Sequence, residues 1–265
     1  MDISWVLGIV LLIIGGILFF VQRGQRQRIK SLQLARDVTV AELQRLAADI
    51  ASEIGGGNWR DYVKLRGILR CDQPLVSELK QAPCIHYQMS VTREYEETIT
   101  QKNSEGQTVR ETQRGSETVA SNRRSVPFYL EDATGRIEVD PDGANPDTVK
   151  ALEDFRPEAA GGMIAYGGFT RVVESASGDR RTLGYRYREA ILPIDQRAVV
   201  VGMLSDRGGN LRVQKPTDAG HQFIISLKDE DTLAKAAESS ANTAFYSMIG
   251  CFGLGGLLIA IAVLT

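Results

Sequence analysis

The chain has 265 residues, a formal net charge of -2 and 43% hydrophobic residues, averages that are typical of an ordinary globular protein. This near-neutral charge provides no long-range field for a polyanion, so we expect no nucleic acid among its partners. Its three cysteines and two histidines are too few for a RING, which binds two zinc ions with four ligands each, and they show no CxxC or HxxxH spacing.

The chain begins with an uninterrupted apolar run from Ile3 to Val21. At the rise of a helix this run spans about 28 Å, close to the roughly 30 Å of membrane hydrocarbon. A cleaved signal peptide is the alternative. It would begin with basic residues and end at a small-residue cleavage site, whereas the chain starts with Met1-Asp2 and the run ends in Phe19-Phe20-Val21. We therefore predict a retained transmembrane anchor over residues 1–22.

Residues 23–58 are predicted to form a helical juxtamembrane segment. Thr39 and Glu42 fit the capping-box pattern, in which each side chain binds a backbone amide at the start of a helix. Apolar residues then recur at helical spacing from Val40 to Ile54, and the glycines at 55–57 are typical of a helix end. The pattern predicts an amphipathic helix that packs on the soluble module or on the membrane surface.

Residues 59–228 are predicted to form a strand-rich soluble module. Apolar and polar residues alternate in several short segments, separated by turns at 132–135, 140–143 and 208–210. The polar stretch 101–125 has almost no apolar residue to bury, so we predict a mobile hairpin tip or loop there. The expected strands cover residues 62–68, broken by Gly67, and then 85–97, 126–130, 136–139, 182–191, 198–204, 211–213 and 223–226.

A second apolar run extends from Ala241 to Leu264, and the residues from Asp229 onward are predicted to lead into it as a helix. Residues 229–265 are thus predicted to be a linker helix and a second membrane span. Glycines give this span a flat face on which another helix could pack closely, which would allow self-association. These glycines are Gly250, Gly253, Gly255 and Gly256.

These elements predict the α+β class, with two transmembrane helices flanking a β-rich soluble module that carries an N-terminal amphipathic helix. The hairpin around 132–135 is of a kind common in five-stranded OB-type barrels, so an OB-like module is one candidate topology. Two spans would leave residues 22–240 on one side of the lipid bilayer. Four basic residues just after the first span outweigh the short acidic tail before it, which predicts a cytoplasmic module with both termini on the opposite side. They are Arg23, Arg26, Arg28 and Lys30.

No catalytic constellation is recognisable. GxSxG, P-loop and GxGxxG motifs are missing, and His86 and His221 are far apart without a partner motif. We therefore predict no catalytic residue, no metal ligand and no cofactor. Cys84 and His86 could share a metal, but staggered positions on a strand are the simpler interpretation, and nothing favours a disulfide between Cys71 and Cys84.

Two further segments have both a chemical and a structural interpretation. Glu94, Glu96 and Glu97 could form an acid/base or metal cluster, or simply the charged end of a strand that faces water. The sequence Tyr-Arg-Tyr-Arg at 185–188 could stack on single-stranded bases, which would suit an OB-like nucleic-acid binder, or belong to a packed strand. In both cases the structural interpretation, an ordinary strand, requires fewer assumptions than the chemical one.

The residues therefore predict a non-catalytic partner-binding or scaffolding module. Its partner would be an unidentified protein, bound through strand edges or the polar loop. Candidate contacts are aromatic and charged residues of the segments 85–97 and 182–191. They are Tyr87, Arg93, Tyr95, Glu96, Glu97, Tyr187 and Glu189.

Nine short segments in order carry a family resemblance. They are Leu65-Arg66-Gly67, Pro74-Leu75, Pro83–Tyr87, Arg93–Glu97, Val126–Phe128, Asp132–Gly135, Tyr187–Glu189, Leu192-Pro193 and Phe223–Ser226. Together with the two anchors they resemble the domain between the membrane spans of the GIDE/MULAN family of mitochondrial and chloroplast RING-type ubiquitin ligases. The resemblance covers residues 35 to 265. The sequence departs from it after Pro193, where a glycine is expected and Ile194-Asp195-Gln196 stand.

This resemblance implies a substrate- or partner-sensing domain. In the family a RING after the second span recruits the ubiquitin-charged enzyme, whereas this chain stops at Thr265. The resemblance therefore also implies an alternative function, as a component of a RING-type ubiquitin ligase whose RING is supplied by another chain. In mitochondrial relatives the domain faces the intermembrane space, while the basic flank of this chain predicts the cytoplasm.

Overall fold

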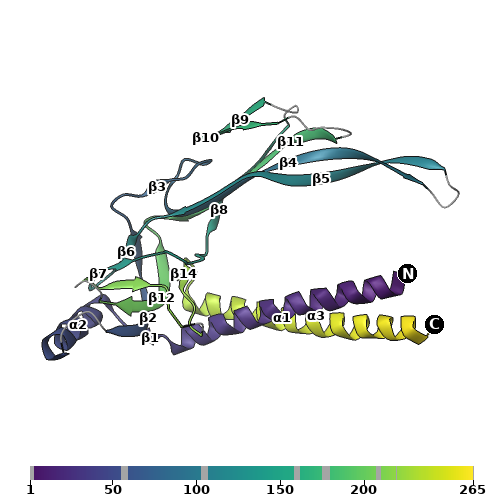
Figure 1. Cartoon of the computed structure of the whole chain (residues 1–265). Coiled ribbons are helices and arrows are strands. Elements are labelled where there is room, and N and C mark those ends of the chain that lie inside the picture. The colour runs from purple at the N-terminus through teal and green to yellow at the C-terminus, as the bar shows by residue number, and fades with distance from the viewer. Residues whose placement is uncertain are drawn as a thin grey trace. The chain divides into compact units, whose positions relative to one another are not determined.

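A computed structural model describes residues 3–54, 59–102, 107–157, 162–174, 180–206, 210–218 and 220–264 (Figure 1). The α+β class is confirmed, with helices α1 (Ile3–Leu34), α2 (Val40–Ile54) and α3 (Glu230–Leu264) and many strands. The chain divides into two compact units. The first comprises Met1–Gly67, Asp132–Ile137 and Ala198–Thr265, and the second comprises Ile68–Glu131 and Glu138–Arg197.

One sheet closes on itself. Its strand order is β1-β2-β6-β7-β13-β12-β14, and β2 also pairs with β12. The strands β2, β6, β7, β13 and β12 therefore form a closed ring, the five-stranded barrel that an OB-like topology requires. The strands are β1 (Arg36–Asp37), β2 (Arg60–Arg70), β6 (Phe128–Asp132), β7 (Gly135–Val139), β12 (Arg197–Ser205), β13 (Arg212–Gln214) and β14 (Ile224–Ser226).

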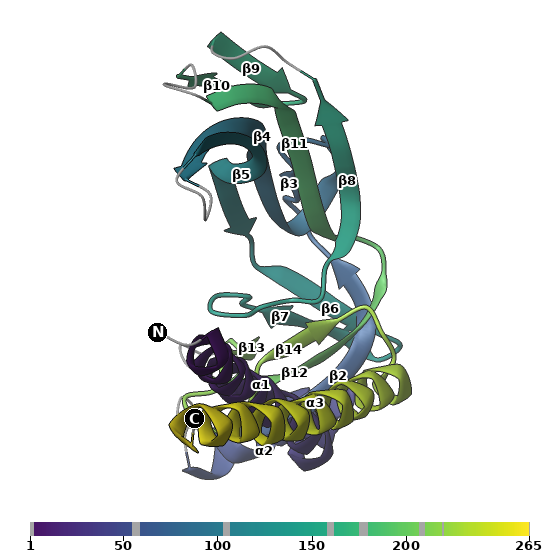
Figure 2. The ribbon, with the colours of Figure 1, turned by 90° about the vertical axis from the view of Figure 1, so that its right-hand side faces the viewer.

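Two long connections between barrel strands build the remaining sheets (Figure 2). Between β2 and β6 come β3 (Leu75–Val76), β4 (Pro83–Lys102) and β5 (Thr108–Ser125). Between β7 and β12 come β8 (Val149–Arg156), β9 (Gly162–Tyr166), β10 (Phe169–Val173) and β11 (Arg180–Pro193). Strands β3, β4, β11 and β8 form a sheet in that order with β5 also paired to β4, while β9 and β10 form a hairpin.

The second unit has its own apolar core. Tyr87, Tyr185 and Tyr187 are fully buried in it, and the β9–β10 hairpin contributes Ile164 and Val173. The predicted alternation of segment 182–191 is confirmed, because Tyr185, Tyr187 and Glu189 are buried while Arg186 and Arg188 lie toward solvent.

The predicted loop at 101–125 is wrong for most of its length. Residues 108–125 form β5, which pairs with β4 from His86↔Ser125 to Lys102↔Thr108; residues 103–106 lie outside the described ranges. Polar composition misled the prediction because most of β5 is exposed, so a hydrogen-bonded ladder rather than a buried face holds it. The predicted break at Gly67 is also absent, since β2 continues to Arg70.

Helices α1 and α3 lie side by side and run antiparallel, with both chain ends at the same end of the pair (Figure 1). Both are long and apolar enough to cross a membrane, over Trp5–Leu34 and Glu230–Ala260. Gly8 and Gly255 let the helices approach closely: a Cβ at Gly8 would lie 2.6 Å from Cγ1 of Ile259. Of the predicted glycine face, Gly255 is therefore occupied by α1, whereas Gly250, Gly253 and Gly256 have no such neighbour within 4 Å.

The inner ends of both helices are attached to the closed sheet. Leu32 and Ala35 at the end of α1 and Leu233 at the start of α3 share one buried cluster with sheet residues. The predicted boundary at residue 22 thus falls inside the continuous helix α1. The sheet residues of this cluster are Tyr62, Val199, Val201, Met203 and Ile224.

Helix α2 begins as the capping box predicts. The Thr39 amide donates to Oε2 of Glu42 at 2.9 Å, and the Glu42 amide donates to Oγ1 of Thr39 at 3.4 Å. A second cap comes from Asp132, whose Oδ2 accepts the Val40 amide at 2.9 Å while its Oδ1 accepts the amides of Thr134 and Gly135 at 2.7 and 3.0 Å. One carboxylate therefore joins the helix start to the β6–β7 turn.

Replacing Asp132 by alanine is expected to lower the free energy of unfolding by about 2–4 kcal/mol, because a helix cap and the turn lose their acceptor together. Burial raises the pKa of this carboxyl, but the hydrogen bonds from Thr134, Val40 and Gly135 prevail and the net pKa is lowered. Its stabilisation is hence present above the unfolded-state pKa of 3.8 and is lost as pH falls through the lower folded value. Urea unfolding of the detergent-solubilised chain measures this, with the exposed Asp142→Ala as control, and equal effects of the two variants would contradict it.

Candidate functional site

Strand β5 is an edge strand. In the described part of the chain this 18-residue strand pairs with β4 alone (Figure 2). Nearly all of its side chains are exposed. An edge strand presents unpaired backbone N–H and C=O groups that can accept another extended chain.

The hydrogen-bond pattern shows which residues of β5 point outward. The Val126 amide donates to the carbonyl of Ile85 at 3.0 Å, which makes the opposed residues His86 and Ser125 a non-hydrogen-bonded pair. By the same alternation Ser121 and Arg123, which oppose Ser90 and Gln88, direct their backbone groups away from β4. The unpaired backbone groups of β5 near its C-terminal end are therefore those of alternate residues from Ser121 to Ser125.

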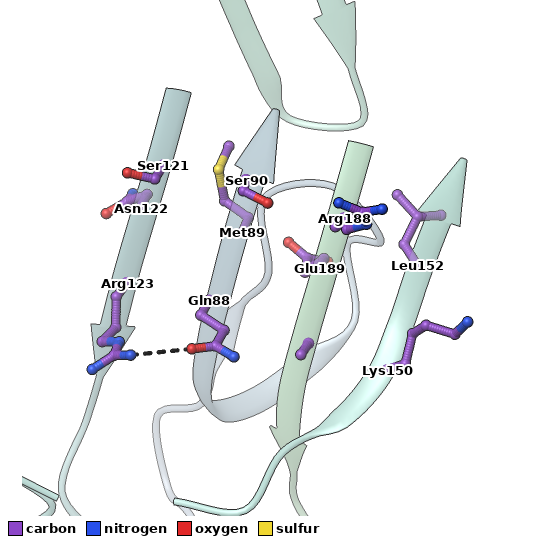
Figure 3. A pocket seen from close by; sticks show the side chains of 11 residues that line it. Gln88, Met89, Ser90, Ser121, Asn122, Arg123, Lys150, Leu152, Arg188 and Glu189 are labelled. Carbon is purple, nitrogen blue, oxygen red and sulfur yellow. Dashed lines mark hydrogen bonds between the residues drawn. The ribbon is translucent and has the colours of Figure 1, made fainter. Parts of the chain in front are cut away.

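The side chains of Ser121 and Arg123 line a shallow hollow on the sheet face beside this edge (Figure 3). Four strands contribute to it in the order β5, β4, β11 and β8, and its volume is about 690 Å³. The same two residues thus belong both to the free edge and to the hollow. The other side chains that face it include Gln88, Ser90, Lys150, Leu152 and Arg188.

The hollow carries more positive than negative charge. Arg123 donates to the neutral Oε1 of Gln88 at 3.2 Å. Lys150 and Arg188 share one carboxylate, each 3.1 Å from an oxygen of Glu153. Hydrogen bonds from Lys150 and then Arg188 lower the pKa of Glu153, so it is ionised at neutral pH. Arg123, Lys150 and Arg188 line the hollow together with one acidic residue, the buried Glu189, and Glu153 pairs with two of the cations. Three cations against two carboxylates leave an excess of positive charge, which suits an acidic ligand.

Three of the predicted contact residues lie in the core. Tyr87 and Tyr187 are 1% and 0% exposed. Glu189 is 2% exposed and accepts the backbone amides of Leu79 and Lys80 at 2.8 and 2.7 Å. Burial, followed by a hydrogen bond to Glu78, raises the pKa of Tyr87 to about 12. Tyr87 and Tyr187 support the sheet from within, whereas Glu189 is almost wholly buried and borders the hollow.

The other four predicted residues lie further along the β4–β5 hairpin in a network of ion pairs. Arg93 pairs with Glu117, and the Arg180 guanidinium lies 4.8 Å from the centre of the Tyr95 ring. Each of the three clustered carboxylates pairs with an arginine, so the charged strand end is favoured over an acid/base cluster. The pairs are Glu94–Arg186 at 2.6 Å, Glu96–Arg181 at 2.8 Å and Glu97–Arg180 at 3.1 Å.

Cys84 and His86, the residues considered above as a metal pair, are buried in the fold. Cys71 and Cys84 are free thiols, and burial raises the pKa of Cys84 to about 11. His86 is 1% exposed, and its Nδ1 lies 2.7 Å from Oγ of Ser125. Within the described ranges, no three His, Cys, Asp or Glu residues are placed to hold a metal ion.

The free edge was the part of the site that sequence reasoning missed, because it lies on the strand predicted to be a loop. The exposure of residues 116–119 alternates in the folded chain, but the residue types of this segment do not alternate between polar and apolar, so the sequence carried little signal of the strand.

The fold defines a protein class: a β-barrel module with an inserted sheet, framed by two helices that are long and apolar enough to span a membrane. The sequence profile of the GIDE family, described as "E3 Ubiquitin ligase", matches residues 96–260, and the chain belongs to that family. A curated relative is the E3 ubiquitin-protein ligase SPL1 of Arabidopsis thaliana, 28% identical over 138 residues. The aligned region covers 52% of this chain and 39% of that protein. No solved structure matches the chain.

Proposed function

We propose that this protein is a membrane-anchored module, non-catalytic by itself, that binds an extended acidic segment of a protein partner. The observation that supports this most directly is the double role of Ser121 and Arg123, whose backbone groups face the open edge and whose side chains line the basic hollow. A partner strand added to β5 would gain main-chain hydrogen bonds, and alternate side chains would select its sequence.

Charge supports the acidic character of the partner. Arg123, Arg188 and Lys150 line the hollow, and Glu189 is the acidic residue among the lining residues. The Glu189 carboxylate is buried and accepts two backbone amides, and Glu153 pairs with Lys150 and Arg188, so positive charge is in excess. A carboxylate on the bound strand could reach the Arg123 guanidinium, which has no ion pair within the described residues. The basic residues that follow the first span further favour a cytoplasmic position for this surface, with both chain ends across the bilayer.

Arg123→Pro is expected to abolish partner binding while preserving the fold. Its amide points outward, so proline removes no hydrogen bond to β4 but disrupts the edge that a partner would use. Asn122→Pro is the matched control: its amide faces Met89 on β4, so this variant should instead lose stability.

The measurement is photocrosslinking of the full chain in its native membrane. A photoreactive side chain at Ser121 should form an adduct of defined mass, and the same group at Val172, which is 76% exposed on β10, should not. Introducing Arg123→Pro should remove the Ser121 adduct. Persistence of that adduct in the folded variant, or equal adducts at both positions, would refute strand addition at β5.

A second candidate function is favoured by the family match over residues 96–260. In this role the chain is a component of a ubiquitin ligase and presents a substrate while another chain supplies the RING. The test combines the purified chain, a ubiquitin-charged conjugating enzyme and a RING-bearing member of the same family. Substrate ubiquitination that requires both chains supports this role, and identical products with and without this chain eliminate it.

A further inference from the structure

The exposed face of α1 carries a basic stripe immediately beyond its apolar run. Phe19, Arg23, Arg26 and Lys30 recur at spacings of three and four residues, which places them on one side of the helix. Phe19 is 45% exposed, and the three cations are exposed as well. They line a shallow groove of about 330 Å³ together with Gln22 and Gln27.

These three cations lack the carboxylate partners that other basic residues of the same unit have. Arg66 pairs with Asp37 and Glu230, and Arg36 pairs with Asp61 at 2.7 Å. Among the residues that the structure describes, no ion pair involves Arg23, Arg26 or Lys30. Their charge is therefore available to a ligand.

The position of the stripe along α1 matches the headgroup layer of a bilayer. At about 1.5 Å per residue, Arg23 and Arg26 lie roughly 3 and 8 Å beyond the last apolar residue, Val21. The headgroup layer is about 5–8 Å thick on each side. Helical side chains lean toward the N-terminus, which on α1 is the direction of the apolar span, and a lysine at position 30 is long enough to reach back.

Helix α3 offers no equivalent surface. It runs in the opposite direction, so side chains before its apolar run lean away from the span. The exposed residues there include both signs, with Lys235 and Glu238 lining one groove. The asymmetry between the helices makes α1 the specific candidate.

We propose that the stripe Phe19, Arg23, Arg26 and Lys30 binds the headgroup of an anionic phospholipid, in the leaflet on the side of the soluble units. The lipid phosphate contacts the arginines, Lys30 closes over it, and Phe19 packs beside the upper acyl chain. This site is independent of the edge of β5 and stands whether or not that edge binds a protein.

Native mass spectrometry of the detergent-purified full chain, titrated with phosphatidylglycerol or phosphatidylcholine, tests the proposal. We expect phosphatidylglycerol adducts at lower lipid concentration than phosphatidylcholine adducts. Replacing the three cations together by glutamine should raise the half-saturating phosphatidylglycerol concentration by about tenfold or more. The matched control removes three exposed positive charges elsewhere. The stripe variant is Arg23→Gln/Arg26→Gln/Lys30→Gln, and the control variant is Arg110→Gln/Arg171→Gln/Lys215→Gln.

The binding curves of the two variants show whether the phosphatidylglycerol site lies on α1. Loss of phosphatidylglycerol binding in the stripe variant alone supports a site on α1. Equal binding of the two lipids, equal loss in both variants, or wild-type binding by the stripe variant would overturn it. Unfolding curves of both variants ensure that lost binding does not reflect a lost fold.

Discussion

Glu189→Leu is expected to lower the free energy of unfolding by about 3 kcal/mol. The Glu189 carboxylate, 2% exposed on β11, accepts the amides of Leu79 and Lys80 in the turn before β4. A leucine of similar volume would leave the buried Leu79 amide and the part-buried Lys80 amide without an acceptor. An unsatisfied buried donor costs about 1–3 kcal/mol, and the part-buried one adds less. The turn matters to the core because Leu79, 3% exposed, packs in the cluster around Tyr87.

Denaturant unfolding of the solubilised chain, followed by circular dichroism, measures this loss. Glu189→Gln should lose about half as much, since its amide oxygen retains one acceptor. Glu111→Leu, at an exposed position of β5, should change stability by no more than about 0.5 kcal/mol. A Glu189→Leu protein with unaltered stability would contradict the structural role and return Glu189 to the contact residues.

The second large effect is acid sensitivity caused by His86. Burial, and to a smaller extent the charge of Arg123, lowers its pKa from 6.5 to about 4. The folded protein therefore binds this proton less tightly than the unfolded chain, and stability present above pH 6.5 is lost as pH falls toward 4. The complete change corresponds to about 3 kcal/mol, of which about 2 kcal/mol is lost by pH 5.

Unfolding free energies of the wild type at pH 7.5, 6 and 5 should reveal this slope. His86→Asn retains a polar contact for Ser125 without a titrating group, so its stability should vary much less over the same range. The range from pH 7.5 to 5 mainly reports on His86, because the carboxyls whose pKa is lowered in the folded protein titrate below their ordinary value near 4. They include Glu42, Glu96, Asp132, Glu153, Asp229 and Glu230. Parallel slopes for both proteins would rule out His86 as the cause.

The sequence predicted correctly those elements that are stabilised by interactions between residues close together in the chain. The Thr39–Glu42 capping box is present as expected, because both of its hydrogen bonds form within one helical turn. The turn at 132–135 is likewise present, since the side chain of Asp132 binds the amides two and three residues onward. The apolar runs became α1 and α3 because their length and hydropathy are sufficient to specify them.

Long-range pairing explains what the sequence analysis missed. Strand β8 contains Ala151, Leu152 and Glu153, which are good helix formers, yet it pairs with β11 from Tyr185↔Arg156 to Ile191↔Val149. The surrounding sheet, not local propensity, makes it a strand. The candidate contacts Tyr87, Tyr187 and Glu189 proved to be core residues for a related reason: alternation identifies two faces of a strand but not which face is covered.

The sequence by itself determined the two apolar helices, the capped helix α2, the strand-rich middle and the family resemblance, because each depends on residues close together in the chain or on their order. Only the tertiary structure decided that β2, β6, β7, β13 and β12 close into a ring and that β5 is a strand with a free edge. It also brought Arg123, Lys150 and Arg188 into one basic hollow. Such features depend on hydrogen-bond ladders between segments far apart in sequence, and a ladder uses backbone groups that every residue shares.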